Sequence, residues 1–175
     1  MKRLVYLISP GKIYKKFYTD LSLVLASKKV KFFQLRLKKT SNSKIIKIGK
    51  KIKIITKKYD VKLIINDSVK LAKKINADGC HIGQLDGSIS SGRKFLKNKI
   101  IGVTCHNSKK LALIALKKKV EYIAFGSFFK SKLKPIAKKA DIKVLKWSKK
   151  NIKKPVVAIG GITDKNYKKL INAGA

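Results

Sequence analysis

Short apolar runs alternate with longer amphipathic segments along the whole chain, and this alternation limits the folds open to it. The runs have the length and the branched residues of β-strands, and the segments between them have helical periodicity. The runs cover residues 4–9, 31–37, 61–66, 78–82, 100–103, 120–126 and 155–159. The helical segments cover residues 14–28, 43–58, 68–76, 90–96, 108–118, 140–149 and 164–173, with Ser43, Ser108 and Thr163 as expected N-caps. Strict alternation predicts a parallel sheet covered by helices.

Two α/β architectures fit this alternation, an open doubly wound sheet and a closed barrel. No Gly-x-Gly-x-x-Gly follows the first run, so the dinucleotide-binding form of the open sheet is not supported. Polar residues gather at the carboxyl end of nearly every run, which is the working face of a barrel. We therefore expect residues 1–175 to form a single TIM-type (β/α)8 barrel domain.

The last residues of the chain bear on the completeness of that barrel. The chain stops at Ala175, where the turn into an eighth strand should begin. We expect seven βα units, with the eighth strand and helix missing from a C-terminally truncated chain. The first and seventh strands would then have exposed edges, which favour aggregation.

The strong positive charge is mostly lysine. The formal net charge is +37, from 45 basic and eight acidic residues, and arginine occurs only at positions 3, 36 and 93. The lysines are spread over every helical segment without interleaved aromatic residues, which indicates solvated helix faces and no specific nucleic-acid partner. No apolar run is long enough to span a membrane, so we expect a cytoplasmic protein. The two cysteines, Cys80 and Cys105, lack metal-binding spacing and are expected to be unreactive.

Three polar side chains alternate along the second run and its end. Gln34, Arg36 and Lys38 share one face of an extended strand, and that face would line the lumen of a barrel. Buried cations need a partner, which can be a carboxylate such as Asp67 or an anionic ligand. A structural Arg36–Asp67 pair is the plainer interpretation. A phosphate or diphosphate site is the interpretation we favour, because a guanidinium matches phosphate oxygens.

Two acidic residues follow the third and fourth runs. The short helical segment between these runs makes them parallel neighbours, so we expect Asp67 and Asp86 to lie side by side past their carboxyl ends. Magnesium is typically held by one or two carboxylates while substrate phosphates complete its shell. The plainer alternatives are a helix N-cap for Asp67 and an ordinary turn residue before Gly87 for Asp86. Together with the cationic strand, the two carboxylates predict a magnesium–diphosphate site.

Two later segments could bind a second anion. Ser131 and Lys134 lie in the loop after the sixth run, and Gly160 and Gly161 end the seventh run. Paired glycines let a backbone approach a phosphate closely, and barrels often bind phosphate after strands seven and eight. Each of these signals is weak alone.

Taken in order, these segments resemble the thiamine phosphate synthase family over essentially the whole chain. The matching segments are residues 34–38 (QLRLK), 64–67 (IIND), 77–86 (ADGCHIGQLD), 101–106 (IGVTCH), 131–134 (SKLK) and 156–162 (VVAIGGI). The resemblance implies a (β/α)8 barrel that joins hydroxymethylpyrimidine diphosphate to thiazole phosphate, two small-molecule substrates, with Mg²⁺ as cofactor. It implies a dissociative reaction, in which diphosphate leaves before the thiazole nitrogen captures the pyrimidine-methyl cation.

The resemblance also implies a role for each matched residue. Asp67 and Asp86 would ligate the magnesium ion, and Arg36, Lys38 and Lys134 would act on the diphosphate. The residues expected to contact the substrates are Gln34, Arg36, Lys38, Asn66, Thr104, Ser131, Lys134 and Gly161. One departure from the family is Leu133, which replaces a hydroxyl residue in the 131–134 loop and removes a donor worth about 1 kcal/mol.

Three other functions remain open at this point. The related thiazole tautomerase has the same fold, and His106 could serve it as acid–base group, but isomerisation gives Asp67 and Asp86 no evident role. A non-catalytic polyanion-binding barrel would account for the lysines. A shortened, inactive form of the synthase would account for the missing eighth unit.

Overall fold

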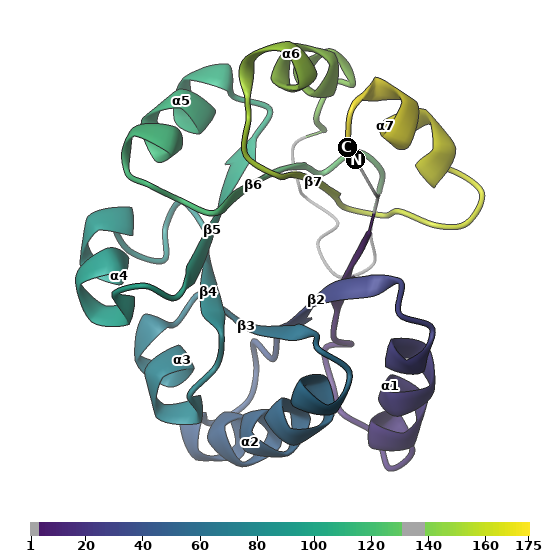
Figure 1. Ribbon diagram of the computed structural model, residues 1–175, viewed down its shortest axis with the longest axis vertical. Coiled ribbons are helices and arrows are strands. Elements are labelled where there is room, and N and C mark those ends of the chain that lie inside the picture. Colours follow the sequence, from purple (N-terminus) through teal and green to yellow (C-terminus); the bar gives the residue numbers. More distant parts are fainter. Residues whose placement is uncertain (1–3, 131–138) are drawn as a thin grey trace. The chain divides into compact units, whose positions relative to one another are not determined.

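The computed structural model describes residues 4–130 and 139–175, whose seven strands and seven helices alternate along the chain (Figure 1). The strands are β1 (Val5–Ile8), β2 (Val30–Leu35), β3 (Lys62–Asn66), β4 (Gly79–Ile82), β5 (Ile100–His106), β6 (Tyr122–Gly126) and β7 (Val156–Ile159). The helices are α1 (Phe17–Ala26), α2 (Asn42–Lys58), α3 (Val69–Ile75), α4 (Ile89–Leu96), α5 (Lys109–Lys117), α6 (Lys143–Asn151) and α7 (Tyr167–Ala173).

The strands form one sheet in sequence order, β1 to β7. Strands β1 to β4 pair in parallel, and so do β5 to β7. A doubly wound sheet reverses its strand order, whereas a (β/α)8 barrel keeps it. The observed order therefore confirms the barrel type of topology. Among the described residues, no helix is long and apolar enough to serve as a transmembrane span.

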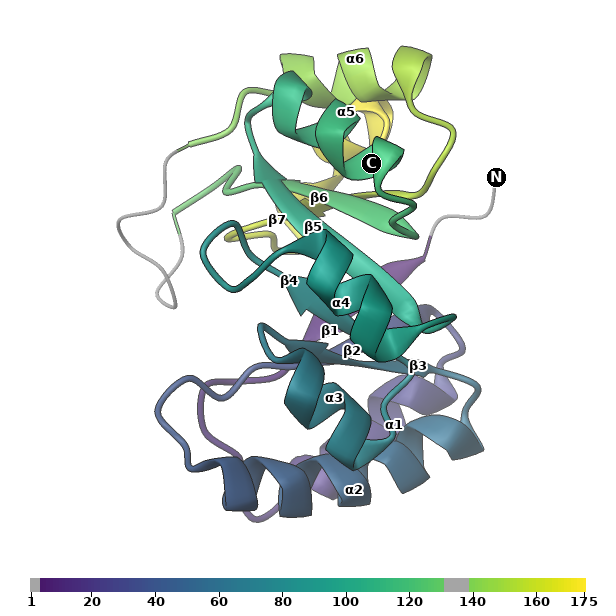
Figure 2. The same cartoon turned by 90° about the vertical axis from the view of Figure 1, so that its left-hand side faces the viewer.

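The described residues fall into two compact units. The first lies within Met1–His81 and Ser91–Ile100. Strand β3 forms its core: Leu63, Ile64 and Ile65 are almost fully buried, as expected for a parallel strand covered on both faces. Helices α2 and α3 pack against β3 and against each other (Figure 2). At that helix contact Gly49 leaves no room for a side chain, because a Cβ would meet Ile75 at 2.6 Å.

The second unit lies within Ile82–Ser90 and Ile101–Ala175. Its core is built on β6, where Tyr122, Ile123 and Phe125 are buried. The ring of Tyr122 occupies the space in front of Gly102 on β5, so that any larger residue at position 102 would overlap the ring. Large and small residues therefore alternate across these two strands.

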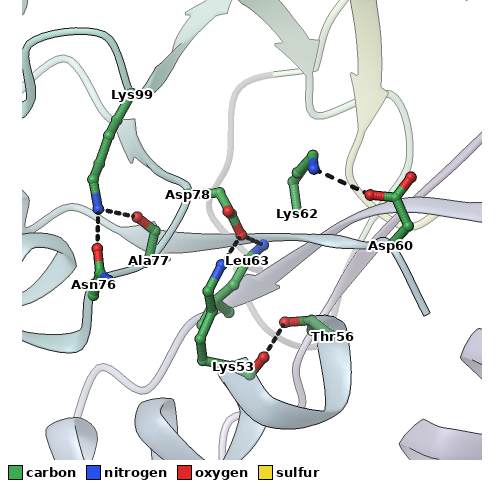
Figure 3. Close-up of polar contacts among 9 residues, drawn as sticks. All are labelled: Lys53, Thr56, Asp60, Lys62, Leu63, Asn76, Ala77, Asp78 and Lys99. Atoms are coloured by element: carbon green, nitrogen blue, oxygen red, sulfur yellow. Dashed lines mark hydrogen bonds and ion pairs between the residues drawn. The ribbon is translucent and has the colours of Figure 1, made fainter. Parts of the chain in front are cut away.

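A polar cluster joins the amino-terminal ends of β3 and β4 in the first unit (Figure 3). Asp78 Oδ2 accepts hydrogen bonds from Lys53 Nζ on α2, at 2.6 Å, and from the backbone N–H of Leu63 on β3, at 2.7 Å. The Lys99 amine donates to Asn76 Oδ1 at 2.6 Å and to the Ala77 carbonyl at 2.7 Å. These contacts attach α2 and the segments before β4 and β5 to the start of β3.

Of the three predicted N-caps, one is confirmed. Ser108 caps α5, because its Oγ accepts a hydrogen bond from a backbone N–H three residues on, at 3.2 Å. Ser43 was wrong: α2 begins one residue before it, and Ser41 occupies the N-cap position. Thr163 was also wrong. Asn166 precedes α7, and its side chain accepts from the Thr163 N–H at 2.9 Å, so a turn comes between Thr163 and the helix.

Candidate functional site

Gln34 is held in place at the end of β2 by two neighbouring segments. Its side chain is only 3% exposed, and Nε2 donates to the Tyr6 hydroxyl at 3.0 Å. Ser9, also buried, accepts from the Arg36 N–H at 2.9 Å and donates its own N–H to the Gln34 carbonyl at 2.9 Å. Sequence reasoning missed Ser9, because a serine after a first strand resembles any turn residue. Its effect is to fix the backbone that leads to Arg36.

Arg36 and Lys38 lie beyond the strand that was expected to include position 36. Strand β2 ends at Leu35, so the predicted end at residue 37 was two residues too long. The Arg36 side chain is half-buried, and within the described residues its guanidinium makes no hydrogen bond or ion pair. The structural Arg36–Asp67 pair is therefore absent from this part of the chain. A half-buried cation without a partner among the described residues favours an anionic ligand.

Lys38 forms an ion pair with Asp67. The distance from Lys38 Nζ to Asp67 Oδ2 is 3.5 Å, and the side chains are 57% and 28% exposed. Lys38 is thus not the buried cation that strand alternation predicted, because the chain has already turned away from the sheet at this point. The pair is open to solvent on the lysine side and more enclosed on the carboxylate side.

Asp67 does not cap the helix that follows it. Ser68 is the N-cap of α3, and its Oγ accepts from the Leu71 N–H at 3.2 Å. Asp67 itself has a left-handed backbone, with φ of 65°, and its N–H donates to the His81 carbonyl on β4 at 2.8 Å. The plainer explanation for Asp67 is therefore wrong. Its carboxylate takes part in the ion pair with Lys38.

A pocket of about 290 Å³ lies beside the Lys38–Asp67 pair, within the first unit. Its floor is apolar and comes from β2, β3 and the facing sides of α2 and α3. Its polar lining consists of Lys38, Thr40, Asn42, Asn66 and Asp67. We call this the Asp67 pocket. It combines a carboxylate, an ammonium group and neutral amide oxygens next to open space.

The oxygen donors of the Asp67 pocket have the chemistry that magnesium requires. Mg²⁺ binds hard oxygen ligands, keeps several waters, and takes one or two carboxylates together with substrate phosphates. Asp67 supplies one such carboxylate, and Asn66 adds an amide oxygen to the same lining. Within residues 4–130 and 139–175, no three His, Cys, Asp or Glu residues are grouped to hold a metal ion. The donors fit a magnesium ion that is completed by water and phosphate.

Asp86 lies in an exposed turn of the second unit, after β4. Its N–H donates to the Gly83 carbonyl at 3.3 Å, and Gly87 follows with φ of 123°. The Gln84 side chain donates to the carbonyl of Thr104 on β5 and anchors the turn there. The turn interpretation of Asp86 is confirmed. A magnesium-binding role and proximity to Asp67 stay predictions.

Thr104 and Gly161 also belong to the second unit. Thr104 is half-buried within β5, which continues to His106 and not only to residue 103 as predicted. Gly161 has φ of 61°, and a Cβ there would collide with the carbonyl oxygen of Lys130. Its own carbonyl accepts from Asn166 Nδ2 at 2.9 Å. The turn after β7 therefore requires glycine for its close packing. Ser131 and Lys134 lie outside the described residues.

Both cysteines are buried in the structure. Cys80 and Cys105 have no exposed surface and form no disulfide. Burial raises the pKa of the Cys105 thiol to about 12, so it stays protonated at neutral pH. Because the thiolate is the reactive form, Cys105 is not a nucleophile in this protein.

The comparisons with known proteins identify the family of this chain. The family model described as thiamine monophosphate synthase matches residues 5–175. A thiamine-phosphate synthase from Pelagibacter ubique is 57% identical over 171 residues, which are 97% of this chain and 83% of the relative. The chain belongs to the thiamine monophosphate synthase family. It is therefore an enzyme, a transferase of thiamine biosynthesis.

Two further relatives support the same family. A thiamine-phosphate synthase from Erythrobacter litoralis is 39% identical and covers 98% of this chain and 83% of its own length. The solved structure of a thiamine phosphate pyrophosphorylase from Pyrococcus furiosus has a TM-score of 0.87 at 28% identity. The match covers 99% of this chain and 82% of the chain in that structure. This likeness confirms the predicted TIM-type fold class.

Proposed function

We propose that this protein joins hydroxymethylpyrimidine diphosphate to thiazole phosphate, which gives thiamine phosphate and diphosphate, by magnesium-assisted loss of diphosphate. The observation that supports this best is the Asp67 pocket. Asp67 is excluded from capping α3 and paired with Lys38 beside about 290 Å³ of open space. A carboxylate and an ammonium group beside open space can hold a divalent cation and phosphate oxygens there.

The proposed roles follow the chemistry of each side chain. Gln34 is fixed by Tyr6 and is suited to orient the pyrimidine, with Asn66 and Thr104 as further polar contacts. Arg36 offers a guanidinium that has no partner within residues 4–130 and 139–175 to the diphosphate, and Lys38 offers an ammonium group. The remaining proposed contacts are Lys134 to the diphosphate and Ser131 and Gly161 to the thiazole phosphate.

Charge on the leaving diphosphate is the main obstacle to the reaction. A magnesium ion held by Asp67 would offset part of the negative charge that develops there. Arg36 and Lys38 supply positive charge to the same oxygens, which lowers the barrier most if both groups are in place before the bond breaks. No side chain has to act as covalent nucleophile or general base.

Release of diphosphate from the pyrimidine substrate is the decisive measurement. It is made with and without thiazole phosphate and magnesium, on the parent protein and on Asp67→Asn, Asp86→Asn and Arg36→Ala. We expect release that needs both additions and falls at least about a hundredfold in each variant. Asp60→Asn is the matched control, because Asp60 is an exposed aspartate at the opposite end of β3.

The possible outcomes separate the candidate functions. Release that persists without magnesium, or that Asp67→Asn leaves unchanged, would refute the magnesium mechanism. Turnover of the thiazole alone, without diphosphate release, would identify a tautomerase. A folded parent that binds neither substrate would refute the synthase assignment.

A further inference from the structure

The Lys38–Asp67 pair gives Asp67 two competing partners. The carboxylate lies 3.5 Å from the Lys38 ammonium, and it is also the proposed magnesium ligand of the first unit. When Asp67 coordinates a divalent cation, the positive charge of that cation repels the Lys38 ammonium group. Asp67 therefore cannot hold Lys38 equally well at the same time. Lys38 therefore has to move when the metal ion binds.

The surroundings of Lys38 allow that movement. Its side chain is 57% exposed, whereas that of Asp67 is 28% exposed and fixed to β4 by the backbone bond to His81. The long lysine stem can reorient within the Asp67 pocket while the carboxylate stays in place. The mobile partner of the pair is thus the lysine.

We infer that Lys38 is an exchangeable counter-ion: it occupies Asp67 until a divalent cation binds, and its ammonium group then turns to the diphosphate. Lys38 thereby couples the two binding events. It opposes metal binding in the free protein and favours the metal–diphosphate complex. This inference rests on the proposed function, because it takes Asp67 as a metal ligand.

Lys39 provides a matched control for Lys38. It is the next residue, it is exposed, and within the described residues it has no ion-pair partner. Lys38→Met and Lys39→Met remove the same charge from the same loop. A comparison of the two variants therefore separates the specific effect of Lys38 from the overall positive potential of this lysine-rich protein. Measurements at about 0.2 M salt suppress non-specific binding to the remaining lysines.

The test uses Mn²⁺ as a spectroscopic substitute for Mg²⁺ and inorganic diphosphate as the anion. Free Mn²⁺ is titrated against each protein by electron paramagnetic resonance, and preformed Mn²⁺–diphosphate by calorimetry. We expect Lys38→Met to bind free Mn²⁺ about two- to fivefold more tightly than Lys39→Met. We expect it to bind the Mn²⁺–diphosphate complex at least about fivefold more weakly. Adding Asp67→Asn to both variants should remove the difference between them in affinity for free Mn²⁺.

The result that would overturn the inference is equal behaviour of the two lysine variants, or a change of the same sign for both ligands. If Mn²⁺ binding still depends on Asp67 in that case, the proposed function stands and only the exchange is refuted. If no protein binds Mn²⁺ in an Asp67-dependent way, the magnesium mechanism and the exchange are both refuted.

Discussion

Asp78 is the residue whose replacement we expect to destabilise the first unit most specifically. Its carboxylate accepts from both Lys53 and the backbone N–H of Leu63 (Figure 3). Its own N–H donates to the Leu63 carbonyl at 2.9 Å, and its carbonyl accepts from Ile100 at 2.9 Å. Replacement by alanine keeps these two backbone bonds but removes both side-chain bonds.

The expected cost can be divided between the two lost bonds. The Lys53–Asp78 pair is about three-quarters buried on each side, and a hydrogen bond between charged groups contributes about 1.5–3 kcal/mol. Leu63 is fully buried, so its N–H would lose its partner away from water, which costs about 1–3 kcal/mol. Because some relaxation is expected, we predict that Asp78→Ala lowers the free energy of unfolding by about 3 kcal/mol. Asp78→Asn should cost about 1 kcal/mol, and Lys53→Met about 1.5 kcal/mol, since both keep an acceptor for Leu63.

Urea unfolding, followed by circular dichroism, measures these differences, and hydrogen exchange at the Leu63 amide locates them. We expect faster exchange at Leu63 in Asp78→Ala but not in Lys53→Met. Asp60→Ala is the matched control, because Asp60 pairs with Lys31 and Lys62 but is 76% exposed, so the loss of these pairs should not be measurable. Equal costs for Asp78→Ala and Asp78→Asn would refute the reasoning, because charge and not the Leu63 bond would then dominate.

Three further predictions concern buried groups. Burial, and then the nearby charge of Lys53, lower the pKa of the Lys99 amine below its usual 10.5. Just below pH 10.5 the folded state therefore binds fewer protons than the unfolded state, so the Lys99 contribution to stability rises with pH toward 10.5 and is lost below the folded pKa. Lys99→Met should flatten that rise. Lys53→Met should raise the Lys99 pKa, which an NMR titration would measure. Cys105, with its pKa near 12, should not react with a thiol reagent at pH 8 until urea unfolds the protein. Gly102→Ala should lower the midpoint of thermal unfolding by several degrees, because its methyl group would overlap the ring of Tyr122.

The fold could be predicted because its signal is repeated. Each parallel strand is buried on both faces and so appears as an apolar run, and each helix adds a separate periodic segment. The ends of the elements were less certain. Strand β2 stops at Leu35 because Ser9 takes over the hydrogen bonds of the following residue, and an apolar pattern carries no information on such a contact.

The candidate site could be predicted only in part. Lys38 and Asp67 were identified from their residue types and positions, but which cation pairs with Asp67 depends on how the chain leaves β2. Asp67 and Ser68 are both good capping residues, so sequence alone could not decide between them. Asp78 gave no sequence signal, since a single aspartate before a strand is ordinary.

The left-handed backbone at Asp67 restricts which acid can evolve at that position. Aspartate and asparagine tolerate such a conformation far better than longer side chains do, so glutamate is penalised there whatever its affinity for a cation. Ser68, in contrast, has the role of N-cap of α3. A library randomised at position 67 should therefore return folded members rich in asparagine and glycine, and selection for catalysis should then recover aspartate from among them. In this protein the peptide conformation narrows the choice of side chain before catalysis does.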